Sequence, residues 1–368
     1  MKIFHFSDTH LGFSEYNNIN PETGLNQREK DFYDAWWQAI DAILATKPDV
    51  VVHAGDLFHT PRPNNRAIRV ALEGIQKISD AGIPMVMISG NHSTPRIRST
   101  GSIFESISLF QHVFAAFSSK YERFRIKDTD FHCVPHCSIS EQLEDAFNNI
   151  KITDARFNVL ITHGAWAGKQ TYSMGEFNEH RLPDIETKLG IGFDYIALGH
   201  YHRRVDIKEH VCYSGSTERT SLNEHNSTCG YLVVDLDSKE KIYHEIKTRP
   251  MIKLNDLDCK NLKTTEIYKA LRSMITPELD NAIVSLRLIN IQHATFVQLD
   301  SREVDKIFDA VFHLEKRFES LEDDGTSSAG TFINALPVEF ERFIHGLPDG
   351  ELDKERLKKM GLNYLNET

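Results

Sequence analysis

From its first residue to about residue 250, the chain alternates apolar runs of strand length with amphipathic stretches of helix length. Five of the runs are short and mostly apolar, as expected for strands that are buried on both faces of a sheet. They lie at residues 3–6, 50–53, 84–89, 159–162 and 195–198. Alternation of this kind predicts α/β layering, with helices that cross between parallel strands.

Three stretches between these runs repeat apolar residues three and four positions apart, which is the spacing of one helix face. They are residues 27–45, 64–81 and 102–110. We interpret Phe32 and Trp36 of the first stretch as core residues because they follow this spacing. Residues 211–214 and 230–236 have the pattern of antiparallel strands, and a second sheet built from them would give a four-layer sandwich.

The pattern changes after residue 250. Residues 266–274 and 301–314 have helical spacing and residues 282–288 have the pattern of a strand, which predicts a small α+β domain over residues 251–320. Residues 321–336 begin with a segment rich in Asp, Gly and Ser and predict a linker. Residues 337–368 predict a tail of two short amphipathic helices. Two helices cannot bury themselves alone, so the tail either packs on the body or binds another protein.

Composition narrows the class of protein. With 368 residues the chain exceeds one average domain, so we expect two domains. A formal charge of −11 argues against nonspecific coating of nucleic acid, because phosphate contacts from Lys and Arg supply most of that affinity. No apolar run approaches the roughly 20 residues of a membrane span, so no membrane association is expected.

The cysteines indicate the redox environment. They form an odd set without paired spacing, and no secretory segment precedes the first strand, so we expect buried free thiols in a reduced, cytoplasmic protein. Cys133 and Cys137, beside His132 and His136, are the alternative: they would suit a zinc knuckle. No second pair of cysteines completes such a site.

Each of the five apolar runs ends in a segment that carries histidine, aspartate or asparagine. The segments are SDTHLG, AGDLFH, SGNH, ITHG and LGHYH. Loops at the carboxyl ends of strands converge on one crevice of an α/β sheet, so residues this distant in sequence can share a site. The candidate metal ligands in these segments are Asp8, His10, Asp56, Asn91, His163, His200 and His202.

Carboxylate, amide and imidazole ligands without a thiolate suit manganese, iron or zinc. Two such ions about 3.5 to 4 Å apart clamp the attacking and leaving oxygens of an in-line displacement at phosphorus, and they acidify a bound water. Asn91 is the most diagnostic ligand, because a neutral amide becomes a sensible ligand where a carboxylate already bridges two ions. The ligand set therefore predicts phosphoester hydrolysis.

Arginines follow three of the five segments and would bring positive charge to a polyanion near the metals. Arg62, Arg66 and Arg69 follow AGDLFH, Arg96 and Arg98 follow SGNH, and Arg203 and Arg204 follow LGHYH. The alternative is that they are ordinary surface arginines, which we expect for at least half of them.

In this order, the five segments resemble the calcineurin-like metallophosphoesterases, and AGDLFH in particular resembles the SbcD, or meiotic-recombination-eleven, nucleases of double-strand-break repair. The resemblance is strong to about residue 215. Beyond it, the resemblance rests only on the position of the later domain in the chain and on its pattern of apolar and polar residues. It implies a four-layer α/β/β/α sandwich over residues 1–250, a smaller α+β capping domain and a short C-terminal helical tail. It also implies two Mn(II) ions per chain.

The resemblance further implies a role for each site residue. One ion would be held by Asp8, His10, Asp56 and His202, and the other by Asp56, Asn91, His163 and His200. His92 would donate a proton or hydrogen bond to the departing oxygen, and His59 would help to position the DNA phosphate. Arg62, Arg96, Arg98 and Arg203 become candidate DNA contacts.

Ser93 departs from the family pattern, in which an acidic residue follows GNH and orients the catalytic histidine. A hydroxyl can accept a hydrogen bond from the imidazole of His92, but it cannot stabilise imidazolium by charge. Either another carboxylate takes its place, or His92 is a weaker acid–base group.

The function implied by the resemblance is a manganese-dependent DNA nuclease. It would be an exonuclease on double-stranded DNA ends and an endonuclease on single-stranded or hairpin DNA, associated with the nucleoid. Its partner would be an SbcC-type ABC ATPase, and residues 64–81 and 102–110 could support a homodimer.

Two other functions stay open. One is a metallophosphoesterase acting on a small phosphodiester or phosphomonoester; a phosphoprotein substrate is disfavoured because GDLFHTP stands where protein phosphatases carry GDxxDRG. The other is a non-catalytic DNA-end-binding scaffold, for which Ser93 is the sole indication.

Overall fold

The computed structural model describes residues 1–94, 101–166, 181–183, 192–321 and 356–357. The chain divides into two compact units. The first comprises Met1–Asn255, Met274–Leu286 and Arg302–Glu315 and contains all the predicted metal ligands. The second comprises Asp256–Ser273, Arg287–Ser301 and Lys316–Thr368.

The first sheet has six strands in the order β12-β11-β1-β2-β3-β4. The strands β1 to β4 run parallel to one another. Their bounds are Lys2–Phe6 for β1, Val50–His53 for β2, Met85–Ile88 for β3 and Val113–Ala116 for β4. β11 (Gly230–Asp235) pairs antiparallel with both β1 and β12 (Glu240–Glu245). The prediction that residues 230–236 belong to a second sheet is wrong, because β11 pairs with β1 and gives the first sheet its antiparallel edge. The predicted runs at residues 159–162 and 195–198 lie instead in the second sheet.

The second sheet also has six strands, in the order β5-β6-β7-β8-β10-β9. Their bounds are Glu122–Ile126 for β5, Thr129–Val134 for β6, Phe157–His163 for β7, Tyr195–Gly199 for β8, Val205–Lys208 for β9 and Val211–Tyr213 for β10. The prediction of an antiparallel strand at residues 211–214 is half right, because β10 runs antiparallel to β9 but parallel to β8.

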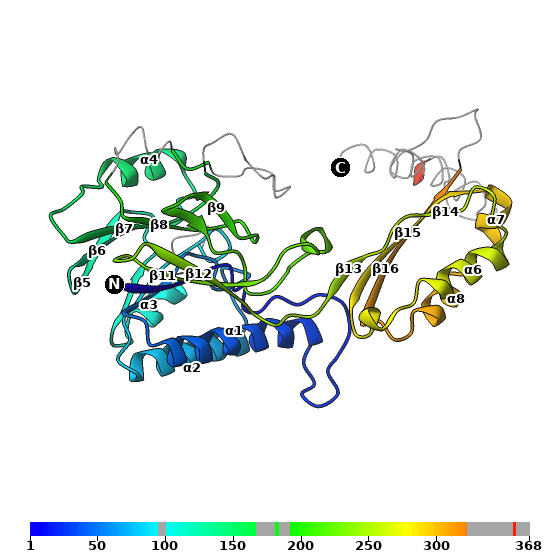
Figure 1. Cartoon of the computed structure of the whole chain (residues 1–368), viewed down its shortest axis with the longest axis horizontal. Coiled ribbons are helices and arrows are strands. Elements are labelled where there is room, and N and C mark those ends of the chain that lie inside the picture. Colours follow the sequence, from blue (N-terminus) through cyan, green and yellow to red (C-terminus); the bar gives the residue numbers. More distant parts are fainter. Residues whose placement is uncertain (95–100, 167–180, 184–191, 322–355, 358–368) are drawn as a thin grey trace. The chain divides into compact units, whose positions relative to one another are not determined.

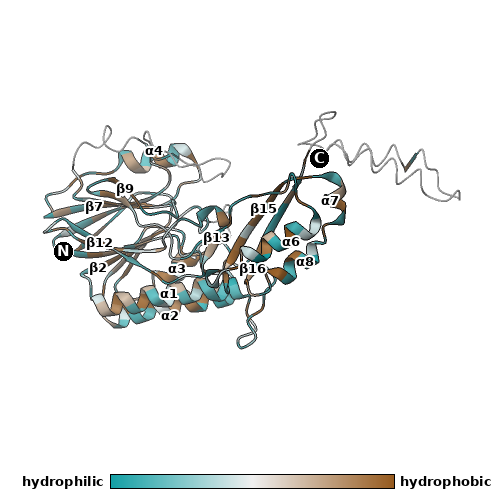
Figure 2. Cartoon of the chain, turned by 45° about the vertical axis from the view of Figure 1, so that its right-hand side comes forward, coloured by the Kyte–Doolittle hydropathy of each residue, from teal (hydrophilic) through white to brown (hydrophobic). Residues whose placement is uncertain are grey.

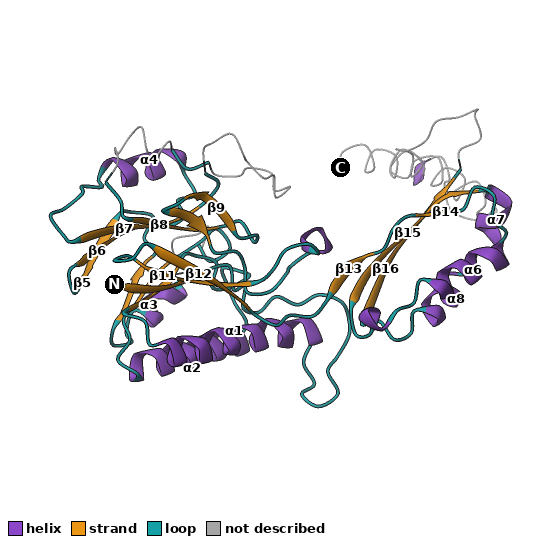
Figure 3. Ribbon diagram, in the orientation of Figure 1, coloured by secondary structure: helices purple, strands orange, loops and turns teal. Residues whose placement is uncertain are grey.

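Helices cover the outer faces of the two sheets (Figures 1 and 3), which confirms the four-layer α/β/β/α sandwich. α1 (Gln27–Thr46), α2 (Asn65–Asp80) and α3 (Ile103–Ile107) pack on the first sheet, and α4 (Ser140–Asn148) packs on the second. Asparagine side chains cap α1 and α2, and a Ser102–Glu105 capping box begins α3. Figure 2 shows both hydrophilic and hydrophobic residues along α1 and α2, as one-sided burial requires.

Strand alternation separates the core into three layers. On β1, Phe4 and Phe6 belong to the same apolar cluster as Trp36 of α1. Phe32 and Trp36 are both fully buried, so they are core residues as predicted. Ile3 of the same strand belongs to a second cluster, which also contains Ile161 of the second sheet. All the cysteines of the chain are buried and none forms a disulfide, as expected. Among the described residues, the groups of three or more possible metal ligands contain no cysteine. Within the described residues, no helix has the length and hydrophobicity to span a membrane.

The C-terminal elements form a third sheet in the order β13-β15-β14, with β16 pairing β15. The strands are β13 (Met251–Lys253), β14 (Leu257–Asp258), β15 (Ile283–Ile291) and β16 (His313–Ser320), and the helices are α6 (Thr264–Ser273), α7 (His293–Gln298) and α8 (Ser301–Ile307). The helix predicted over residues 301–314 was wrong in its second half. α8 ends at Ile307, and residues 313–320 pair with β15 because their side chains alternate in strand fashion. Of the two predicted tail helices, only residues 356–357 are described, and they are helical; the rest lies outside the described residues.

Candidate metal centre

The predicted ligands lie at the carboxyl ends of β1, β2, β3, β7 and β8, as expected for loops that converge on one crevice. Asp8, His10, Asp56 and His163 are at most 2% exposed, and His200 and His202 are 8% exposed. Asn91 is half-buried. Carboxylates buried this deeply need a cation or hydrogen-bond donors around them.

Four of these residues have left-handed backbone conformations, which are uncommon outside glycine. The φ angles are 52° at Asp8, 42° at His10, 54° at Asp56 and 108° at His200. Each costs on the order of 1 kcal/mol and persists because other contacts hold it. The amides of Asp8 and His10 donate to the carbonyls of Gly55 and Asp56, each at 3.0 Å, and so tie the loops after β1 and β2 together.

Two glycines allow the ligand loops to approach closely. A Cβ atom on Gly55 would lie 2.3 Å from Nδ1 of His163, and one on Gly90 would lie 2.2 Å from Oδ1 of Asp56. Both distances are far below contact, so any side chain at these positions would displace a predicted ligand.

Two groups of ligand atoms converge, and Asp8 belongs to both. In the first group, with His10 and His202, Nε2 of His10 lies 3.0 Å from Nε2 of His202. In the second, with Asp56 and His163, Nε2 of His163 lies 3.2 Å from Oδ2 of Asp56. Facing nitrogens and carboxylate oxygens at these separations suit a shared cation.

The remaining predicted ligands lie beside the second group. Oδ1 of Asn91 lies 2.9 Å from Nε2 of His163. The ring of His200 lies 5.4 Å from that of His163, and the His200 amide donates to both Asp8 carboxylate oxygens at 3.1 Å. The structure thus brings all the predicted ligands into one region, and the shared carboxylate of the two groups is Asp8, whereas the resemblance implies Asp56.

His59 and His92 adjoin the ligands and form a third group with His10. The ring of His92 stacks on that of His59 at 5.2 Å and meets that of His10 edge-on at 4.9 Å. The His92 amide donates to Oδ1 of Asp56 at 2.9 Å. This contact ties the backbone of His92 to a predicted ligand, and its ring lies beside those of His10 and His59.

The hydroxyl of Ser93 makes its hydrogen bonds to Phe58, and the imidazole of His92 makes its own to a backbone carbonyl. Its Oγ accepts from the amide of Phe58 and donates to the Phe58 carbonyl, both at 3.4 Å. Nδ1 of His92 instead lies 3.0 Å from the carbonyl of His59. Because a carbonyl can only accept, Nδ1 carries the hydrogen, which leaves Nε2 for proton transfer. A backbone dipole therefore orients this imidazole.

Burial and neighbouring carboxylates shift the pKa values of the histidines in the site in opposite directions. Burial alone lowers the pKa of His163, but the facing Asp56 carboxylate outweighs it and raises this pKa to about 9. The pKa of His202 is likewise lowered by burial and raised by Glu224 to about 9. Burial holds the pKa of His10 well below its usual value. Both imidazoles are therefore protonated and positively charged at neutral pH. A divalent cation that binds them would replace these protons.

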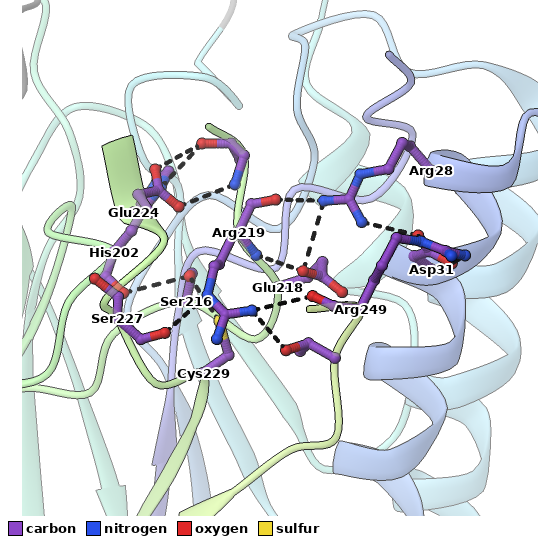
Figure 4. A network of polar contacts seen from close by, with 12 residues as sticks. Arg28, Asp31, His202, Ser216, Glu218, Arg219, Glu224, Ser227, Cys229 and Arg249 are labelled. Atoms are coloured by element: carbon purple, nitrogen blue, oxygen red, sulfur yellow. Dashed lines mark hydrogen bonds and ion pairs between the residues drawn. The ribbon is translucent and has the colours of Figure 1, made fainter. Parts of the chain in front are cut away.

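Contacts behind the ligands were not predicted from the sequence. Oε1 of Glu224 lies 2.8 Å from Nδ1 of His202 (Figure 4), and the Ala54 carbonyl lies 2.9 Å from Nδ1 of His163. The Ser7 hydroxyl donates to Asp8 at 2.5 Å. Ser7 adjoins a predicted ligand and was accessible to sequence reasoning, whereas Glu224 follows His202 by 22 residues in a segment without a recognisable motif.

The arginines that follow the predicted ligand segments differ in their surroundings. Of the candidate DNA contacts, Arg62 and Arg203 are exposed, and Arg96 and Arg98 lie outside the described residues. Two further arginines form ion pairs: Arg66 with Glu29 at 3.3 Å and Arg204 with Asp206 at 2.8 Å.

Residues 1–204 match the family described as calcineurin-like phosphoesterase. The chain is also similar to three archaeal proteins, each named DNA double-strand break repair protein Mre11. The protein of Thermoplasma acidophilum is 29% identical over 330 residues, which cover 85% of this chain and 82% of the relative. That of Methanocaldococcus jannaschii is 30% identical over 71% of each chain. That of Methanococcus maripaludis is 29% identical over 61% of this chain and 59% of the relative.

Proposed function

This chain belongs to the calcineurin-like phosphoesterase family, in its Mre11 branch, and from that premise we propose that it is a manganese-dependent nuclease that processes DNA ends in double-strand-break repair. It is a metal-dependent phosphodiesterase. The observation that carries the proposal is the convergence of two ligand groups and of His59 and His92 at one end of the sandwich.

The residues present fit two divalent ions. Asp8, His10 and His202 would hold one, and Asp56, Asn91, His163 and His200 would surround the other, with a carboxylate bridging them. When bound, such ions supply an acidified water and neutralise charge on the phosphodiester. Their ligands are oxygen and nitrogen atoms without a thiolate, which suit manganese, iron or zinc, and the family resemblance favours Mn(II) among these.

The chain's own residues would manage the leaving group. The His59 carbonyl holds Nδ1 of His92, so Nε2 faces the site and can donate a proton to the departing oxygen. The ring of His59 stacks on that of His92 and is placed to contact a phosphate oxygen. Exposed Arg62 and Arg203 would extend positive charge along the bound strand.

We assign to this site both an exonuclease activity on double-stranded ends and an endonuclease activity on single-stranded or hairpin DNA. The partner would be an SbcC-type ABC ATPase, in the cytoplasm and at the nucleoid. A homodimer is supported by Trp37, Leu72 and Phe110, which line an apolar surface groove along α1, α2 and the end of α3. The capping role of residues 251–320, the linker at 321–336 and the docking role of 337–368 are further parts of the proposal.

A substrate panel tests the proposal. Purified protein with MnCl₂ is incubated with end-labelled duplex DNA, hairpin DNA, a nitrophenyl phosphodiester and a phosphopeptide. We expect stepwise shortening of the duplex and opening of the hairpin. Cleavage of the small phosphodiester alone would favour the small-molecule function, and DNA binding without any cleavage would favour the scaffold.

Deleting residues 337–368 tests the partner. The truncated chain should retain manganese-dependent nuclease activity and lose co-purification with the ATPase, because the sandwich carries the site and the tail carries the contact. Unchanged co-purification would place the partner's binding site elsewhere.

A further inference from the structure

Glu224 is a carboxylate with only 13% side-chain exposure, placed behind the ring of His202. Its Oε1 lies 2.8 Å from Nδ1 of His202, while Nε2 of the same ring faces His10 at 3.0 Å. Because an ionised carboxylate can only accept, Nδ1 carries the hydrogen and the lone pair of Nε2 is presented to the metal centre.

Other contacts fix the Glu224 carboxylate in place (Figure 4). Its Oε1 accepts from the Thr220 hydroxyl and its Oε2 from the Thr220 amide, both at 2.9 Å. Glu224 ends the short 3₁₀ helix η2 (Leu222–Glu224), which Ser221 caps. Both carboxylate oxygens are therefore engaged, so the side chain cannot rotate away from His202 without breaking several hydrogen bonds.

The segment that carries Glu224 is anchored on the same unit by Arg219. The guanidinium donates to the Ser227 carbonyl at 2.8 Å and to the Thr248 hydroxyl at 2.9 Å, and the Arg219 amide donates to Glu218 at 2.8 Å. Arg28, which is fully buried, donates to the Arg219 carbonyl at 2.6 Å. These contacts make residues 218–227 a fixed support and not a loose loop.

Two of the other ligand imidazoles, those of His163 and His10, differ from His202 in the group that lies behind Nδ1. Nδ1 of His163 faces the neutral carbonyl of Ala54 at 2.9 Å. Nδ1 of His10 has no hydrogen-bond partner among the described residues. His202 therefore has a full negative charge behind its ring, which His163 and His10 lack. A carboxylate in this position raises the basicity of the opposite nitrogen and strengthens it as a metal ligand.

We propose that Glu224 is a positioning residue for the ion held by Asp8, His10 and His202, and that it strengthens metal binding at this position. The inference rests on the metal centre of the proposed function and deepens it. Glu224 touches neither substrate nor metal; it acts through the orientation and basicity of His202. Loss of a carboxylate that supports a ligand typically weakens metal affinity by about 10- to 100-fold.

The test compares the full-length wild-type chain with Glu224→Gln and, as a matched loss of charge, Glu209→Gln, an exposed residue between β9 and β10. Mn(II) binding is measured by titration calorimetry, and coupling between the ions by electron paramagnetic resonance. We expect Glu224→Gln to weaken one binding step by about 10- to 100-fold, to leave the other step unchanged and to abolish the coupled-pair signal at manganese levels that fill the wild type. Glu209→Gln should match the wild type.

A second variant, Thr220→Val, removes the hydroxyl that holds Oε1 of Glu224 but keeps the carboxylate, so it should weaken the same step by a smaller factor. Unchanged affinities in Glu224→Gln overturn the proposal. Equal weakening of both steps together with a lower Tm also overturns it, because it indicates a general structural role. The nuclease proposal fails separately: if the wild type binds two ions but cleaves no DNA, the role of Glu224 in metal binding still stands.

Discussion

Gly90 is the position at which one methyl group should disable the site without unfolding the chain. A Cβ atom there would lie 2.2 Å from Oδ1 and 2.6 Å from the amide nitrogen of Asp56. An ordinary contact begins at 3.4 Å, so in Gly90→Ala both the Asp56 carboxylate and the backbone at its amide must shift by about 1 Å relative to residue 90. Oδ1 accepts from the His92 amide and Oδ2 faces His163, so the displacement reaches both of these residues.

A misplacement of about 1 Å in a catalytic arrangement lowers the rate by about 100-fold. We therefore expect Gly90→Ala to lower manganese-dependent hairpin cleavage by about that factor and to weaken Mn(II) binding measured by calorimetry. The backbone at Gly90 lies outside the left-handed region, so alanine adds no conformational strain of its own.

Gly82→Ala is the matched control. Gly82 has a φ of +68° and open space around its Cβ position, so alanine strains the backbone there without touching the ligands. This variant should lose on the order of 1 kcal/mol of stability and keep its activity. Wild-type metal binding and cleavage in Gly90→Ala would refute the close packing of Gly90 against Asp56.

Further predictions concern acid–base chemistry, pH and metal removal. His92→Ser should abolish cleavage and keep two bound Mn(II) ions; loss of the ions as well would make His92 a ligand. Burial lowers the pKa of His5 to about 3, so unfolding takes up a proton there and stability falls as the pH drops from 6.5 toward 3. Urea titrations should show that the stability lost between pH 7 and pH 5 is about 2 kcal/mol smaller in His5→Gln than in the wild type; an equal loss would contradict this. Chelation with EDTA should lower Tm. Mn(II) at 100 times its Kd should stabilise the folded chain by about 2.7 kcal/mol for each occupied site, and a Tm independent of manganese would contradict the binding of both ions.

Sequence reasoning predicted the sandwich well because periodicity reports burial directly. The runs at residues 3–6, 50–53 and 195–198 became β1, β2 and β8 almost residue for residue. It failed at residues 308–314, where the apolar residues Val311 and Phe312 continue the spacing of the preceding helix although α8 ends at Ile307 and β16 begins at His313. The strands β5, β6, β9 and β12 were not predicted, because polar residues interrupt them and leave no continuous apolar run. β4 was missed as well, although Val113–Ala116 is apolar throughout.

The sequence by itself determined the ligand chemistry, since residue types and their order at strand ends limit the site to oxygen and nitrogen ligands around divalent ions. Tertiary structure alone decided how those ligands are oriented. It placed Glu224 behind His202, turned Ser93 toward Phe58, and gave His92 the carbonyl of His59 as its partner. Hydrogen bonds of this kind join atoms that local periodicity does not relate, so they depend on how loops from separate strands pack, and no single segment encodes them.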